Sequence, residues 1–172
     1  LLAQLASYRL DIVLSDEPAP ASGSPRMFNH LLGECGITLC AGRKLAARLR
    51  ATFPCSLHGA PALLPGPQTA LRRALEEWFR DEGIIPRLVA EFDDAALMNW
   101  MASDGLGFFP LPTPVAQEAV AHYGVRVVGR VENCRQAFYA ITAERKVAHP
   151  AIIAITTQAK ASLGGMPPPA GG

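Results

Sequence analysis

The amino-acid sequence predicts an α/β fold in which short apolar strands alternate with amphipathic helices around a mostly parallel sheet. The alternation is clearest over residues 61–128, where apolar runs are separated by stretches whose apolar residues recur at helical spacing. Strands joined through a helix are almost always connected by right-handed crossovers. The pattern is interrupted near Gly33 and near Gly129, on either side of this block. Extended segments that enter and leave a βα block predict two lobes joined by two crossing strands, with a cleft between them.

The residues before the block predict a helix, a strand and a broken extended segment. The run 10–14 is typical of a parallel strand, and residues 28–32 and 37–40 are extended. The segment 33–36 places glycines on both sides of a charge and a thiol, which favours a bend or crossover over a regular strand. Residues 43–50 predict a short basic helix. The first helix is expected from apolar residues that share one face: Leu1, Leu2, Leu5 and Tyr8.

The block itself begins with a strand over residues 62–64. Thr69 is placed to cap the helix that follows, because its hydroxyl can accept from a free amide of the first turn. The apolar run 88–92 is typical of a strand buried on both faces. Asp93 and Asp94 then offer an N-cap and a first-turn negative charge for the next helix. The first of these helices presents one apolar face: Leu71, Leu75, Trp78 and Phe79.

Gly105 ends the second helix of the block, and residues 107–112 form the next strand. Thr113 predicts an N-cap, with Pro114 at the first helical position of a third helix. Gly124 ends that helix.

The last part of the chain predicts two more strands and a helix. Residues 125–128 form a strand, and residues 129–133 break the pattern for a second time. Another strand over 138–142 and a helix over 150–163 follow. Residues 164–172 are rich in glycine and proline and predict a disordered tail.

Composition excludes several classes of protein. A net charge of +1 over 172 residues gives no electrostatic footprint for nucleic acid on this chain. No apolar run is long enough to span a membrane. Pro65 and Gly66 before Thr69 resemble a phosphate cradle, but no lysine follows, so a plain βα turn is the better interpretation and no cofactor is expected.

The cysteines and histidines do not form recognisable sites. The cysteines show neither a CxxC pair nor a histidine at ligand spacing, which favours small buried thiols in a reduced cytosolic protein over a metal or disulfide role. The histidines lie near no nucleophile motif, so an enzyme is not expected and surface or capping roles are favoured. The residues concerned are Cys35, Cys40, Cys55, Cys134, His30, His58, His122 and His149.

Several short segments match one known family in their order along the chain, up to about Ser162. They are residues 10–16, 33–36, 64–66, 91–98, 129–133, 143–145 and 149–151. Together they resemble the effector-binding domain of LysR-type transcriptional regulators. Within that family, the resemblance is to activators of a sodium/proton antiporter gene.

The resemblance implies a type II periplasmic-binding-protein-like fold, with two Rossmann-like lobes joined by two crossover strands and a small effector in the cleft. It also implies a cytoplasmic dimer or tetramer that binds DNA through an N-terminal winged helix-turn-helix. That domain and the first elements of the first lobe are missing from this sequence, so we expect an incomplete first lobe and no DNA binding by the chain alone. The first lobe is expected over residues 1–33 and 131–163, and the second over 34–130. A solute-binding protein of a transporter and a small α/β enzyme are the alternatives.

The predicted site lies where strands end, since ligands bind at the carboxyl ends of strands in open α/β sheets. Carboxylates gather there, and their oxygens are suitable ligands for a hard cation such as Na⁺. A carboxylate whose pKa is raised by burial could also respond to pH. The alternative is that Asp93 caps its helix and the other carboxylates are solvated. Gly33, Gly36, Gly129 and Asn133 form the expected hinge. The candidate effector-binding residues are Ser15, Asp16, Glu34, Thr38, Gly66, Thr69, Glu91, Phe92, Asp93, Asp94, Phe109 and Pro110.

Overall fold

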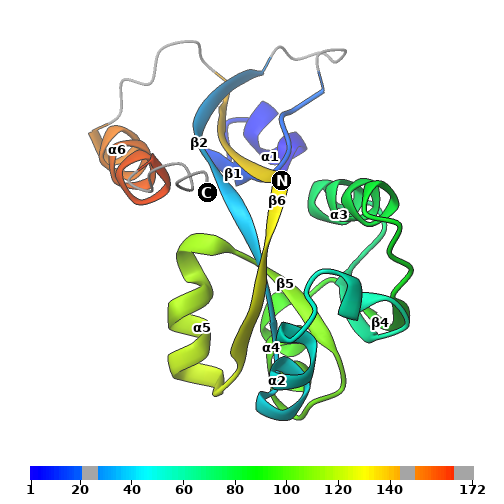
Figure 1. Ribbon diagram of the computed structural model, residues 1–172. Coiled ribbons are helices and arrows are strands. Elements are labelled where there is room, and N and C mark those ends of the chain that lie inside the picture. The colour runs from blue at the N-terminus through cyan, green and yellow to red at the C-terminus, as the bar shows by residue number, and fades with distance from the viewer. Residues whose placement is uncertain (21–26, 144–149, 165–172) are drawn as a thin grey trace. The chain divides into compact units, whose positions relative to one another are not determined.

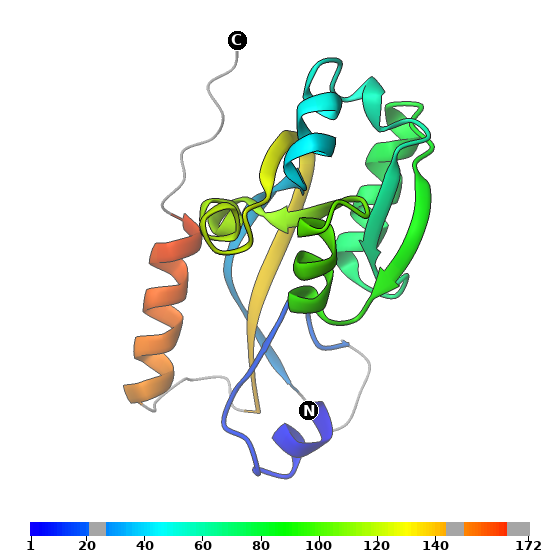
Figure 2. The same ribbon diagram turned by 90° about the horizontal axis from the view of Figure 1, so that it is seen from below.

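The chain folds into two compact units in the computed structural model (Figure 1, Figure 2). Unit 1 comprises Leu1–Cys35 and Ala137–Gly172, and unit 2 comprises Gly36–Gln136. The predicted division into two lobes, with its boundaries, remains a prediction. The structure describes residues 1–20, 27–143 and 150–164.

Strands and helices alternate along the chain, which confirms the predicted α/β class. The strands of the described residues are β1 Val13–Ser15, β2 Phe28–Ala41, β3 Pro61–Pro65, β4 Arg87–Phe92, β5 Phe108–Pro112 and β6 Arg126–Thr142. The helices are α1 Leu2–Ala6, α2 Arg43–Arg50, α3 Ala70–Asp81, α4 Ala95–Ser103, α5 Ala116–Tyr123 and α6 Pro150–Gly164, with 3-10 turns η1 Cys55–Leu57 and η2 Thr113–Val115. No described helix is long and apolar enough to cross a membrane.

The sheet is mixed rather than mostly parallel. Its strand order is β1-β6-β2-β5-β3-β4. Strand β3 runs parallel to β4 and β5, whereas β5 is antiparallel to β2 and β1 is antiparallel to β6. The parallel pairs of β3 lie within the βα block, where a helix provides each crossover.

Unit 1 begins differently from the prediction. Helix α1 ends at Ala6, and Tyr8 lies outside it with a φ of 55° and an exposed side chain. The expected parallel strand over 10–14 is wrong, because β1 is a three-residue strand that pairs antiparallel with β6, Val13 opposite Ile141. Leu5, which is fully buried, packs with these two residues in the core of unit 1.

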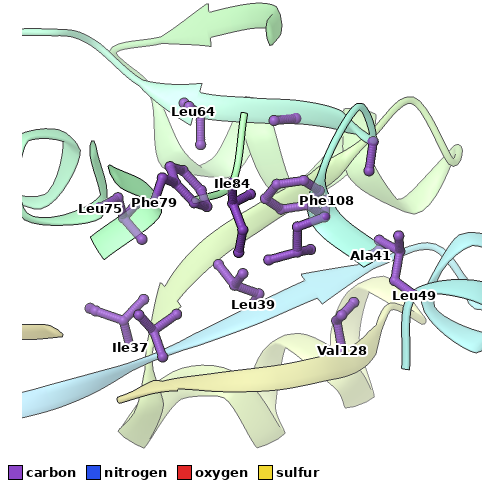
Figure 3. Close-up of a cluster of buried hydrophobic side chains, with 14 of the residues drawn as sticks. Ile37, Leu39, Ala41, Leu49, Leu64, Leu75, Phe79, Ile84, Phe108 and Val128 are labelled. Atoms are coloured by element: carbon purple, nitrogen blue, oxygen red, sulfur yellow. The ribbon is translucent and has the colours of Figure 1, made fainter. Parts of the chain in front are cut away.

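The core of unit 2 lies on both faces of its sheet, because successive residues of a strand point to opposite faces. On β5, Phe108 packs with the helices α2 and α3, while Phe109 packs with α4 and α5. The same alternation separates Leu39 from Cys40 on β2. Figure 3 shows the first cluster, in which the rings of Phe79 and Phe108 meet edge to face at 6.3 Å. Unit 2 therefore has helices on both faces of its strands.

Strand β4 is the edge of the sheet, and the prediction of a strand buried on both faces is wrong for it. Leu88 is 44% exposed and Val89 is 37% exposed. Among the described strands only β3 lies beside β4, so the packed helices cover β4 less than they cover the central strands. An apolar run of this length has the same pattern at an edge as in the middle of a sheet.

The two predicted interruptions are also wrong, since β2 and β6 run without a break through residues 33–36 and 129–133. A Cβ at Gly129 would meet the Phe53 ring at 2.7 Å, so this glycine makes room for an aromatic side chain. In β6, Asn133 departs from extended geometry, with a φ of 59°. The hinge at Gly33, Gly36, Gly129 and Asn133 remains a prediction.

Burial separates the cysteines. Cys35, Cys40 and Cys134 are buried, as expected, but Cys55 is exposed in η1. Burial raises the pKa of Cys40 and the pKa of Cys134 to about 11, so both thiols stay protonated near neutral pH.

Candidate functional site

Two turns of unit 2 meet at the carboxyl ends of the parallel strands β3 and β4. The backbone N–H of Gly66, after β3, donates a hydrogen bond of 3.1 Å to the carbonyl of Phe92. A Cβ built on Gly66 would lie 2.7 Å from the carboxylate Oδ1 of Asp93. The Asp93 carboxylate therefore occupies the space that a side chain at position 66 would need. Three residues of the predicted site, Gly66, Phe92 and Asp93, are thus brought together at the edge where ligands bind in such sheets.

Thr69 holds the first of these turns and caps α3, as predicted. Its hydroxyl donates to the Gly66 carbonyl at 2.9 Å and accepts from the Arg72 backbone N–H at 3.2 Å. Both bonds lie within the turn. Thr69 therefore shapes the loop that carries Gly66.

Glu91 is bonded to a cation that sequence reasoning missed. Arg72, on α3, is 8% exposed, and its Nη1 donates to the Glu91 carboxylate at 2.8 Å and to the Pro65 carbonyl at 3.0 Å. Its Nε donates to Glu76 at 2.7 Å. Burial alone lowers the pKa of Arg72, but the bonds and charges of Glu91 and Glu76 outweigh it and raise the pKa above its ordinary value. The guanidinium stays charged and compensates the Glu91 carboxylate.

The N-cap of α4 is Asp94, so the interpretation of Asp93 as the cap is wrong. Asp94 Oδ1 accepts from the backbone N–H of Ala96 at 2.8 Å and of Leu97 at 3.2 Å. The helix starts at Ala95, one residue later than a cap at Asp93 requires. Asp93 is exposed, and its carboxylate is left for another role beside Gly66.

A second polar pair lies where β2 faces β5. The hydroxyls of Thr38, which is 2% exposed, and Thr113 are 3.0 Å apart. The predicted cap at Thr113 is wrong, because Val115 is the N-cap residue of α5. Thr113 was missed as a site candidate because the Thr-Pro pair favours a capping role. Phe109 and Pro110 of β5 are buried, and Phe109 packs in the core between β5 and α4.

The remaining candidates belong to unit 1. Ser15 pairs with Tyr139 in the β1–β6 ladder, and its hydroxyl accepts from the Glu17 N–H at 3.1 Å. Asp16 and Glu34 are also engaged in polar interactions. Within the described residues, no three side chains of His, Cys, Asp or Glu gather as a metal site would require.

Two surface pockets of unit 2 contain none of the predicted residues. One, of about 270 Å³, lies between α4 and α5. The other, of about 560 Å³, lies between α2 and the turn that follows α4. Both lie apart from the turns that carry Gly66 and Asp93.

Comparison with known proteins places the chain in one family. The family model for the LysR substrate binding domain matches residues 1–164. The chain is 35% identical over 152 residues to the transcriptional activator protein NhaR of Escherichia coli (strain K12), and equally to NhaR of Shigella flexneri. These alignments cover 88% of this chain and 50% of each relative. The chain thus spans about half the length of the curated relatives it matches.

Solved structures agree in fold. CbnR, a LysR family transcriptional regulator, superposes with a TM-score of 0.69 at 16% identity, over 92% of this chain and 54% of that chain. The reduced regulatory domain of OxyR2 from Vibrio vulnificus gives a TM-score of 0.65 at 14% identity, over 95% of this chain and 77% of that one. The fold is the type II periplasmic-binding-protein-like fold of these domains, as the resemblance implied. The matched proteins are transcriptional regulators rather than enzymes. Because the family model matches residues 1–164, the chain belongs to the LysR substrate binding domain family.

Proposed function

We propose that this chain is the effector-sensing part of a transcriptional activator that controls a sodium/proton antiporter gene in response to Na⁺ and pH. The 35% identity to the activator NhaR over most of the chain supports an activator. A solute-binding protein is not favoured, because the matched relatives regulate transcription.

The observation that carries the cation proposal is the Asp93 carboxylate over Gly66. Within the part of the chain that the structure describes, it has no capping role, since Asp94 caps α4, and the buried guanidinium of Arg72 is bonded instead to Glu91 and Glu76. Hard cations prefer carboxylate and carbonyl oxygens, and both are present at a strand end. A proton competing for the same carboxylate would couple the response to pH.

The proposed response is a change in the population of two arrangements of the lobes. A ligand that binds one arrangement more tightly shifts the equilibrium toward it. The proposed hinge is formed by Gly33, Gly36, Gly129 and Asn133, on the two long strands that contribute residues to both units. Effector-site residues proposed beside Asp93 are Ser15, Asp16, Glu34, Thr38, Gly66, Thr69, Glu91, Phe92, Asp94, Phe109 and Pro110.

The intact regulator is proposed to bind DNA in the cytoplasm through a winged helix-turn-helix outside this chain, as a dimer or tetramer. Strand β4 is a candidate assembly surface in unit 2. It is an edge strand with exposed Leu88 and Val89, and unpaired edge strands readily pair with another chain.

Promoter activity against Na⁺ concentration at fixed pH tests the proposal in the intact regulator. Asp93→Asn should shift the midpoint of the curve while DNA affinity stays unchanged, because the amide keeps the size of the side chain and removes its charge. Asp81→Asn, at the exposed end of α3, is the matched control. An Asp93→Asn curve that overlays the wild type would mean that this carboxylate does not sense the cation.

A further inference from the structure

The pocket of about 560 Å³ lies at the opposite end of β3 from the proposed cation site. Its wall includes Pro61, the first residue of β3, whereas Gly66 follows the last residue of that strand. Helix α2, which is labelled in Figure 1, and the turn after α4 provide the other walls. The lining residues are Gly42, Arg43, Lys44, Leu45, Arg48, Pro61, Ser103, Asp104 and Gly105.

The walls of this pocket are packed firmly against each other at their closest point. A Cβ built on Gly42 would lie 3.1 Å from the carbonyl oxygen of Ala102 and 3.1 Å from the Cα of Gly105. Gly42, itself buried, therefore lets the start of α2 approach the end of α4. The pocket is thus built between backbone segments, so its shape does not depend on long surface side chains alone.

Cations dominate the lining. Arg43, Lys44 and Arg48 are exposed, and in the described part of the chain none of the three has a hydrogen-bond or ion-pair partner for its side chain. Asp104 is the carboxylate among the lining residues, and it forms no salt bridge with them. The lining therefore carries a positive charge that the described residues leave uncompensated.

The placement of these cations opposes the local electrostatics of the helix. Arg43 and Lys44 occupy the first turn of α2, which contains no acidic residue, although the positive end of the helix dipole disfavours cations there. Lys44 and Arg48 are also a like-charged pair at i and i+4, which destabilises a helix. Sequences break such local rules most often at functional sites. An anion in the pocket would relieve both conflicts.

We propose that this pocket binds a small phosphomonoester, as an input separate from the proposed Na⁺ response. Guanidinium groups of Arg43 and Arg48 can each bond two phosphate oxygens, and Lys44 adds a point charge. Leu45 and Pro61 offer apolar surface to a short carbon chain. Asp104 can accept from a hydroxyl of the ligand, which favours a hydroxylated phosphomonoester over free phosphate. The volume is within the range of small-molecule sites.

The direct test is a titration of the ¹⁵N-labelled 172-residue chain with the potassium salt of glycerol 3-phosphate, followed by NMR. Amide shifts should saturate and concentrate on residues 42–48 and 103–105. Inorganic phosphate should shift the same amides with weaker affinity, whereas glycerol and potassium chloride at equal ionic strength should not. Shifts spread over the whole basic surface, or no saturation, would overturn the proposal.

Paired variants separate the pocket from general charge effects. Lys44→Gln with Arg48→Gln should weaken glycerol 3-phosphate binding by about tenfold or more, since it removes two charge-assisted contacts. Arg80→Gln with Arg130→Gln, both exposed and absent from the pocket lining, should leave the affinity unchanged. Equal weakening by both pairs would overturn the proposal. So would a short DNA duplex that shifts these amides while glycerol 3-phosphate does not.

The pocket variant carries its own check on folding. Because it removes a like-charged pair and a first-turn cation, the ligand-free Tm should stay unchanged or rise. A clear fall in Tm would show that these cations make structural contacts, which contradicts the premise of the site. None of these results depends on Asp93 or on Na⁺.

Discussion

The substitution Gly66→Ala examines the contact that the proposed cation site depends on. The new methyl group would start 2.7 Å from Asp93 Oδ1. The one other described atom within 4 Å of that Cβ is the Cγ of Asp93, at 4.0 Å. The exposed Asp93 side chain, rather than the backbone, is therefore the group that must move.

The cost in stability should be small. Turning Asp93 away from its present rotamer costs on the order of 0.5–1.5 kcal/mol. Replacing glycine by alanine at a compatible backbone position stabilises the folded state by about 0.4–1 kcal/mol, because it restricts the unfolded chain. Gly66 is not among the glycines with positive φ, so the backbone accepts alanine. The net change in the free energy of unfolding should be about 1 kcal/mol or less.

The functional effect should be larger than the stability effect. Urea denaturation of the chain gives the change in stability, and promoter activity against Na⁺ in the intact regulator gives the response. We expect near wild-type stability with a shifted Na⁺ midpoint, because the carboxylate has been displaced. Gly59→Ala is the control, at a glycine with open space around it. Because the φ of Gly59 is 68°, this substitution should lower stability but leave the Na⁺ response unchanged. A loss of more than about 3 kcal/mol, or an unshifted midpoint, would refute the reasoning.

Three further outcomes follow from the structure. Arg72→Leu should lose about 1–3 kcal/mol in urea denaturation, because its partners are partly exposed and solvent replaces some of the lost bonds; a change near zero would contradict the network. Stability should fall as pH rises from about 9 to about 11, because the folded state keeps the thiol protons of Cys40 and Cys134 that the unfolded state releases. Cys40→Ala should flatten that slope, and a slope that is unchanged speaks against thiol burial as its cause. Leu88→Glu on β4 should weaken self-association in sedimentation equilibrium of the intact regulator without unfolding it; unchanged association would remove β4 as an assembly surface.

Much of unit 2 could be predicted from the sequence because its local signals agree with its tertiary packing. Thr69 caps α3, and the apolar face of that helix, including Leu75 and Phe79, is buried as its spacing indicates. Gly105 and Gly124 end α4 and α5 with positive φ. In each case a short-range pattern suffices, since helix ends and amphipathic faces depend on residues close in the chain.

Long-range facts were not predictable in the same way. The exposure of β4 depends on which strands lie beside it, and an apolar run does not encode its place in the sheet. The continuity of β2 and β6 through their glycines depends on neighbours such as Phe53, which fills the space beside Gly129.

The candidate site was predicted in part. The sequence placed Gly66 and Asp93 at strand ends, and the structure brings them into contact. Two adjacent aspartates made the position of the helix cap ambiguous by one residue in the sequence. In the structure Asp94, and not Asp93, caps α4. Arg72 was missed because α3 contains three arginines and the sequence does not indicate which of them is buried.

The proposed sensing of Na⁺ at the edge formed by Gly66 and Asp93 is tested most directly by thermal unfolding of the intact regulator. The unfolding is followed in NaCl, LiCl and KCl at equal ionic strength and fixed pH. A ligand that binds only the folded state stabilises it by about 1.4 kcal/mol at ten times its Kd. We predict that NaCl raises the Tm of the wild type above its value in KCl, and that Asp93→Asn removes this difference while Asp81→Asn retains it. Equal Tm values in NaCl and KCl for the wild type, or a sodium-specific rise that survives in Asp93→Asn, would contradict the account.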